Sequence, residues 1–270
     1  MDIIINHAGA LKDHQPIPAL GNFYHQLFAC LGYADEQFAL ADLLRQYHQL
    51  KGRWLMVSPI HWQATHNDAM IMAAGDELAW SVEESRQCFD VFSRFVHEDG
   101  MTALYHDKTT WLLRCDGKPE MNAVPVHGLL HQSLMKALQQ LDSTLFWQRF
   151  LTETQMLFNT QPLNQSLVNG VWIWGAGSLP APVHKPIVVS SERLHQLASL
   201  LSTEVLNEKS ISVYPKNSIL LFESLAEPER EALQSRVAKE RVHWYWNNIA
   251  YTTKPPSLWS RLMENLSRAN

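Results

Sequence analysis

The 270-residue sequence has few of the features that mark several common protein classes. Its three cysteines show no Cys-x-x-Cys spacing, which argues against a zinc ribbon or a disulfide framework and favours a reducing, cytoplasmic compartment. No run of lysine and arginine occurs and the net charge is −5, so we expect no nucleic-acid partner. No apolar run approaches the ~18 residues that span a membrane, and we expect no membrane partner. Met1–Asn6 is too short, and too poor in basic residues, for a signal peptide.

What the sequence does contain is typical of a globular α/β protein. Hydrophobic residues make up 46% and charged residues 18%, which is enough apolar material for a sizeable core. Predicted strands alternate with predicted helices, so the expected fold is a mixed, mainly parallel sheet flanked by helices. Because no repeat or low-complexity linker interrupts the pattern, we expect a single domain over residues 1–270.

The predicted elements follow the apolar periodicity of the chain. The strands are expected at Ile3–Ile5, Trp54–Val57 (with Ser58–Trp62 as its exit loop), Ala69–Ala73, Thr102–Tyr105, Trp111–Arg114, Val168–Trp174, Ile187–Val189, Ile219–Phe222 and His243–Trp246. The helices are expected at Pro18–Leu31, Glu36–Leu50, Ser81–His97, Pro125–Leu141, Thr144–Phe158, Ser191–Leu201 and Glu227–Lys239. Ser81, followed three residues later by Glu84, predicts a capping box at the start of the third helix.

The stretch Val168–Gly177 is the most distinctive in the chain. Trp172 and Trp174 are two residues apart, so in a strand both side chains lie on one face. Gly175 and Gly177 follow them and would let backbone amides approach a ligand closely. We therefore expect this strand to face a small molecule or a protein partner, with simple core packing of Trp172 as the alternative.

Four polar residues lie before this predicted strand or at its start and are expected to form a rim beside it. They are Glu153, Asn159, Asn164 and Asn169. In the alternative interpretation, Asn159 only helps to end a helix and Asn164 only orders a turn, which are common roles for asparagine.

Two groups of histidines have a spacing that could bind a metal ion. His61, His66 and Asp68 lie within eight residues, although a loop-orienting His61 and a hairpin turn at His66 explain them better than metal binding does. His127 and His131 have i, i+4 spacing on a predicted helix, but no glutamate follows His127 as the zinc-hydrolase pattern requires.

Two blocks carry a family resemblance, Ser58–Asp68 and Trp147–Pro180 with its Trp-x-Trp-Gly-x-Gly segment. They resemble a bacterial family described both as cofactor-independent phosphoglycerate mutases and as RpfE-type regulatory proteins. That family is distantly similar to the archaeal-type phosphoglycerate mutases of the alkaline phosphatase superfamily. The resemblance implies a fold of that type, with a serine nucleophile and two metal ions, usually manganese or zinc, in the active enzymes.

The sequence lacks residues that would bind the metal ions of this implied site. The stretch Ile5–Leu11 has no aspartate where the family has a metal-binding Asp-Gly loop, and Leu220–Arg230 contains neither histidine nor aspartate. We therefore expect a catalytically degenerate pseudoenzyme without a cofactor, acting as a binding or regulatory protein, with the remaining family site near the Trp172/Trp174 strand and His61.

The alternative is an active mutase or phosphatase that uses Mn or Zn. Its candidate ligands are His7, His61, His66, Asp68 and Glu223. A different enzyme with His61 as a base, or a purely structural subunit, is also open.

Overall fold

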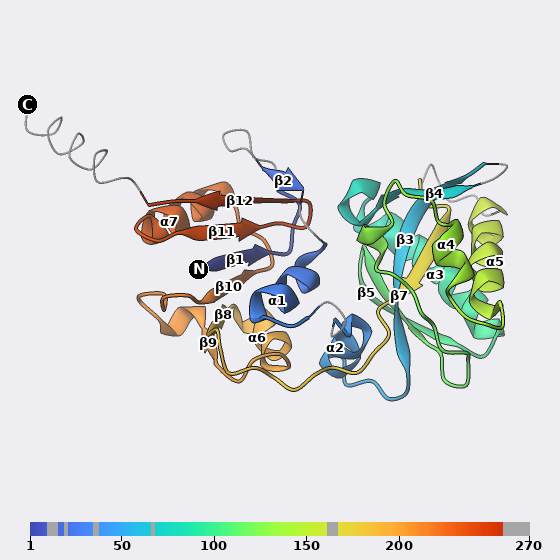
Figure 1. The fold of residues 1–270 in the computed structure, drawn as a ribbon, viewed down its shortest axis with the longest axis horizontal. Coiled ribbons are helices and arrows are strands. Elements are labelled where there is room, and N and C mark those ends of the chain that lie inside the picture. Colours follow the sequence, from blue (N-terminus) through green and yellow to red (C-terminus); the bar gives the residue numbers. More distant parts are fainter. Residues whose placement is uncertain (10–15, 19–20, 35–37, 66–67, 161–166, 256–270) are drawn as a thin grey trace, which may run out of the picture. The chain divides into compact units, whose positions relative to one another are not determined.

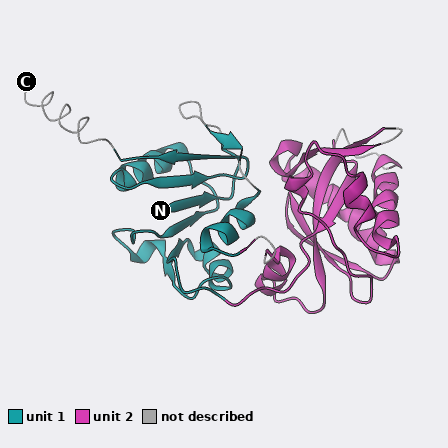
Figure 2. Cartoon of the chain, viewed as in Figure 1, with its two compact units in different colours: residues 1–33, 182–270 teal, residues 34–181 magenta. Residues whose placement is uncertain are grey.

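The computed structural model describes residues 1–270 except 10–15, 19–20, 35–37, 66–67, 161–166 and 256–270. The described chain is a mixed α/β protein (Figure 1). It forms two compact units, residues 1–33 with 182–270 and residues 34–181 (Figure 2), where the sequence led us to expect one domain. Unit 1 is discontinuous because unit 2 is inserted after its first helix. The second junction lies in a proline-rich stretch that contains Pro180, Pro182 and Pro186.

Unit 1 is built on a seven-stranded sheet in the order β2-β12-β11-β1-β10-β8-β9. Five neighbouring strands run parallel, from β11 to β9, whereas β12 is antiparallel to β11 and pairs with β2. The bounds are β1 Asp2–Ile5, β2 Ile17–Pro18, β8 Val188–Ser190, β9 Val205–Asn207, β10 Ile219–Phe222, β11 Val242–Tyr245 and β12 Ile249–Thr253. The mainly parallel sheet that we expected is therefore present in this unit.

The helices of unit 1 cover both faces of this sheet. They are α1 (Phe23–Leu31), α6 (Glu192–Ser199), the 3₁₀ turn η4 (Glu208–Ser210) and α7 (Glu227–Val237). Leu233 and Val237 of α7 pack in one core cluster with Ile3, Ile5 and Leu220. Ile4 and Leu221 alternate with these strand residues and are also buried, as in a sheet covered on two sides.

Unit 2 contains a separate antiparallel sheet of five strands. Its long strand β3 (Trp54–Ala64) pairs with β6 (Thr110–Arg114) along its first half, with β4 (Ala69–Ala74) along its second half, and with β7 (Gly170–Trp174) through its middle. The fifth strand, β5 (Thr102–Asp107), pairs with β6. We did not expect two sheets of different type.

The helices of unit 2 pack on this antiparallel sheet. They are α2 (Leu40–Tyr47), η2 (Gly75–Leu78), α3 (Val82–Glu98), η3 (Val126–Gly128), α4 (Met135–Gln139) and α5 (Phe146–Thr160). Contacts join α2 to β3, α3 to β5 and α5 to β7. The predicted capping box is present: Glu84 N–H donates to the Ser81 hydroxyl, and Ser81 N–H donates to the Glu84 carboxylate.

Two predicted elements were wrong. Ser58–Trp62 is not an exit loop, because β3 continues through it and Pro59 pairs with Val171 of β7. Pro125–Leu141 is not one helix, because the backbone between η3 and α4 bonds to β4 instead, with His131 N–H donating to Ile71 O at 2.9 Å. His131 has a φ of 57°, so the expected helical i, i+4 relation with His127 does not exist.

No helix in the described part of the chain is both long enough and apolar enough to cross a bilayer.

A pair of histidines joins α2 to β5 in unit 2. Nε2 of His48, the C-cap of α2, lies 2.8 Å from Nδ1 of His106. A contact of this length holds one proton between the rings, so charging both is unfavourable. Burial, followed by the neighbouring His106, lowers the pKa of His48. Burial lowers the pKa of His106, and Asp107, 3.8 Å away, only partly opposes this.

The lowered pKa values of His48 and His106 predict how the stability of unit 2 depends on pH. A histidine whose folded pKa lies below its unfolded value takes up a proton on unfolding, so stability falls as pH drops through and below ~6.5. We expect the urea midpoint of wild type to fall more steeply between about pH 7.5 and about pH 5.5 than that of the double variant His48→Gln, His106→Gln. Equal slopes for the two proteins would contradict this assignment.

Candidate functional site

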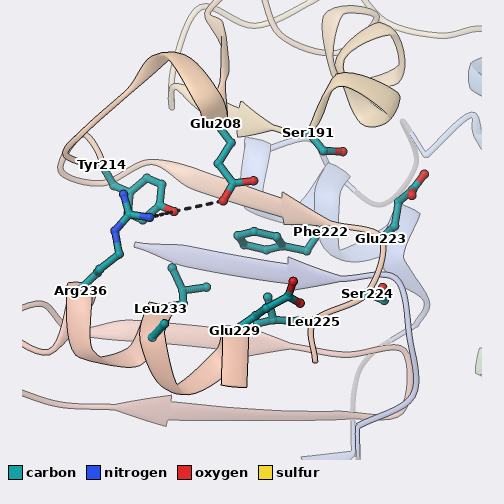
Figure 3. A pocket seen from close by; sticks show the side chains of 11 residues that line it. Ser191, Glu208, Tyr214, Phe222, Glu223, Ser224, Leu225, Glu229, Leu233 and Arg236 are labelled. Atoms are coloured by element: carbon teal, nitrogen blue, oxygen red, sulfur yellow. Dashed lines mark hydrogen bonds between the residues drawn. The ribbon is translucent and has the colours of Figure 1, made fainter. Parts of the chain in front are cut away.

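The carboxyl ends of three parallel strands in unit 1 meet beside a cavity. The strands β8, β9 and β10 end at Ser190, Asn207 and Phe222, and the residues that follow them line a space of about 420 Å³ with one side formed by α7 (Figure 3). In open α/β sheets this edge is where ligands usually bind, because the loops that leave the strands can vary without disturbing the sheet. The cavity volume is typical of a small-molecule site.

The floor of the cavity is apolar. Phe222 lies in the middle of the site, with Leu225 and Leu233 below it in the view of Figure 3. Leu233 is buried, while Phe222 and Leu225 are partly exposed and pack against the core cluster of unit 1. A hydrophobic part of a ligand can therefore continue the core of the unit outward.

A phenol and a guanidinium close one end of the cavity. The Tyr214 hydroxyl donates to Glu208 Oε1 at 3.3 Å and accepts from Arg236 Nη1 at 2.9 Å. The guanidinium of Arg236 also lies 4.3 Å from the centre of the Tyr214 ring. Burial, followed by the Glu208 carboxylate, raises the pKa of Tyr214, so the phenol stays neutral and keeps the proton that it donates.

Two further carboxylates and a serine complete the lining. Glu223 follows β10 and accepts from Arg193 Nη1 at 3.3 Å. Glu229 lies in the first turn of α7 and accepts from the Ala226 N–H at 2.9 Å. Ser191 is the N-cap residue of α6, but its buried Oγ makes neither a cap bond nor any other hydrogen bond to the described residues.

This arrangement is suited to holding a ligand. The lining combines an apolar floor with carboxylates and hydroxyls from several loops, which is the usual composition of a specific pocket. No histidine or cysteine is among the described residues that line the cavity.

The two tryptophans singled out in the sequence are in the core of unit 2. Trp172 and Trp174 are 0% and 1% exposed. Their indole N–H groups donate to Val124 O and to Ser58 Oγ, each at 2.9 Å. These contacts satisfy the polar atom of each ring, and both side chains act here as packing groups.

The glycines and Asn169 also have structural partners. Gly175 and Gly177 have φ angles of 79° and 135°, and an added Cβ would lie 3.2 Å from Met56 and 3.2 Å from Ala39, respectively. The close approach is thus to the chain's own residues. Asn169 accepts from Trp62 N–H at 2.9 Å and donates to Trp62 O at 2.8 Å, which extends the pairing of β7 beside the bulge in β3.

The other predicted site residues are not gathered around these tryptophans. Glu153 is exposed on α5 and lines a separate cavity with Lys118 and Arg149, and Asn159 is exposed near the end of the same helix. The Nδ1 atom of His61 lies 2.7 Å from Leu167 O. Asn164 is outside the described residues.

The candidate metal ligands do not form a metal centre within the described residues. His7 and Glu223 belong to unit 1, whereas His61 and Asp68 belong to unit 2, and His66 is outside the described residues. Asp68 Oδ1 accepts from the Ser133 hydroxyl and from Ala69 N–H, both at 2.7 Å. Among described residues no group of three or more histidine, cysteine or acidic side chains could hold an ion. The described candidate ligands therefore do not fit the two-metal centre that the family resemblance implies.

Sequence reasoning found one residue of the cavity, Glu223, and missed the rest. Ser191 and Glu223 lie just after the predicted strands Ile187–Val189 and Ile219–Phe222, so the strand-end rule applied to these strands would have pointed to this edge. Glu208 follows β9, which the sequence did not predict. Tyr214 and Arg236 are 22 residues apart, and nothing in their spacing indicates that they stack.

Burial of the tryptophans generates a prediction about stability. Replacing Trp172 by alanine removes a fully buried indole and should lower the free energy of unfolding by about 3–5 kcal/mol, measured by urea denaturation. Met156→Ala is the control in the same unit: Met156 is 62% exposed, and the change should stay within about 0.5 kcal/mol. A Trp172→Ala protein with wild-type stability would show that the indole is not core.

Because the described candidate ligands form no metal-binding cluster, we can predict the metal content of the purified protein. We expect the purified protein to contain far less than one manganese or zinc ion per chain, and to show no 3-phosphoglycerate turnover after either ion is added. Elemental analysis and a coupled assay measure the two quantities. Stoichiometric metal together with turnover would establish a metal centre.

Comparisons with known proteins give only a distant structural similarity. No family model matches the chain, and no curated protein matches it. One similar solved structure is a cofactor-independent phosphoglycerate mutase from Thermoplasma acidophilum DSM 1728, with 12% sequence identity and a TM-score of 0.35 over 95% of this chain and 90% of that one. Values this low define neither the family nor the function of the chain.

Proposed function

We propose that this chain is a binding protein whose unit 1 holds a small organic molecule in the cavity beside β8, β9, β10 and α7. The cavity of about 420 Å³ at the carboxyl ends of three parallel strands is the observation that carries the proposal. The proposal keeps the binding role suggested by the sequence. It moves the site from the Trp172–Trp174 strand of unit 2 to the strand ends of unit 1.

The lining supports binding as the main activity. A ligand would cover Phe222 and Leu225, whose partly exposed side chains border the buried core of the unit. It would also meet polar groups from several chain segments. A few polar groups that converge on an apolar floor fix the orientation of a ligand, while its apolar part supplies affinity. Whether binding also gives the protein a regulatory role depends on which molecule is bound.

A variant that fills the cavity tests this proposal. Ala232 lines the cavity and is exposed on α7, so Ala232→Trp should occupy the space at little cost to folding. A diverse set of small metabolites would be screened by ligand-observed NMR against wild type and this variant. We expect compounds that bind wild type and whose binding is lost in Ala232→Trp.

The matched control is Ser235→Trp, on the same helix and equally exposed but not part of the lining. It should bind the same compounds as wild type. The proposal fails if no compound binds wild type, or if compounds that do bind are unaffected by Ala232→Trp.

A further inference from the structure

We propose that the ligand of this cavity is an organic ammonium ion with an apolar body, held by Glu208, Glu223 and Glu229 over the face of Phe222. This inference rests on the binding function proposed above and adds the chemical class of the ligand.

The first step is the distribution of charge around the cavity. Among the described residues that line it are three carboxylates and one basic side chain, that of Arg236. The carboxylates come from separate places in the chain: Glu208 follows β9, Glu223 follows β10, and Glu229 is on α7. Figure 3 shows Glu208 above Phe222, Glu229 below it and Glu223 toward one side. The apolar floor is thus bordered by negative charge on several sides.

The second step concerns the bases, which are directed at the protein itself. Arg236 donates to the Tyr214 hydroxyl and to Ser212 O, at 2.9 and 3.3 Å, and its guanidinium stacks on the Tyr214 ring. Arg193, beside the cavity, reaches Glu223. Among the described residues, neither Glu208 nor Glu229 forms an ion pair. An anionic ligand would therefore be repelled by two carboxylates that have no ion-pair partner among the described residues, whereas a cation would be attracted by them.

The third step is the aromatic ring. Phe222 presents a partly exposed ring at the centre of the lining. The face of an aromatic ring attracts ammonium groups, and the attraction adds to that of nearby carboxylates when water is displaced. Leu225 and Leu233 extend the floor and would contact the apolar body of the ligand. The combination of carboxylates, ring and aliphatic floor favours a cation that also has an apolar body.

Three probes with one body and different charges test the class of ligand. They are phenethylamine, 2-phenylethanol and 3-phenylpropionate, titrated into the full-length protein by calorimetry or NMR. We expect phenethylamine to bind most tightly, and its binding to be lost in Ala232→Trp. Glu208→Gln and Glu229→Gln should each weaken it about twofold to fivefold, as expected for a partly exposed charge contact, and should leave 2-phenylethanol unchanged.

Glu231→Gln is the matched control, because it removes the same charge from α7 outside the lining. It should leave phenethylamine binding as in wild type. Phe222→Leu keeps the floor apolar but removes the ring face, and should weaken the amine more than the alcohol.

The outcomes separate this inference from the proposed function. If 2-phenylethanol or 3-phenylpropionate binds as tightly as the amine and Ala232→Trp abolishes that binding, the cavity is a ligand site but the ammonium class is wrong. If the glutamine variants bind the amine as wild type does, the carboxylates are not the recognition groups and the inference also fails. If neither these probes nor the metabolite set shows binding that Ala232→Trp removes, the proposed function fails with it.

Discussion

The position of β10 in the parallel sheet is the constraint on which the site in unit 1 depends. β10 pairs with β1 on one side and β8 on the other, with Phe222 opposite Ile5 and Leu221 opposite Ser190. This register ends neighbouring strands at one edge and turns Leu220 and Phe222 toward α7. A shift of one residue would exchange the faces of the strand and turn Phe222 away from the cavity. The location of the site is thus set by backbone pairing before any of its polar side chains is considered.

Helix α7 converts this edge into a cavity with a defined charge pattern. Leu233 and Val237 bind the helix to the sheet. Glu229 and Arg236 lie four residues before and three residues after Leu233, so helical periodicity brings both to the same stripe. Glu229 accepts a backbone N–H at the start of the helix, where negative charge is favoured. The carboxylate is therefore stabilised by the helix and still lines the cavity, and one residue serves both the fold and the site.

The parts of the fold and the site that could be predicted are those encoded by neighbouring residues in the sequence. Apolar runs located β1, β4 and β10, and the Ser81–Glu84 capping box located the start of α3. Pro125–Leu141 misled because its periodicity is helical, whereas its backbone bonds to β4. The division into two units was not expected, because unit 1 is completed by segments separated by 148 inserted residues, 34–181. The prolines near the second junction, Pro180, Pro182 and Pro186, are equally typical of a loop within one domain. In the site, the Glu208–Tyr214–Arg236 contacts depend on tertiary packing that no sequence spacing reveals.

The tryptophans show why a distinctive sequence pattern is weak evidence for a site. Trp172 and Trp174 alternate in a strand as expected, but alternation defines a face and not what that face meets. Strand β7 lies beside β3 and under α5, so its inner face is core and each indole N–H finds an oxygen there. The cavity of unit 1 has no such pattern, because its residues belong to loops after strands and to an exposed helix. Groups available to a ligand must stay outside the core, and the apolar periodicity that reveals strands and helices is a signal of the core alone.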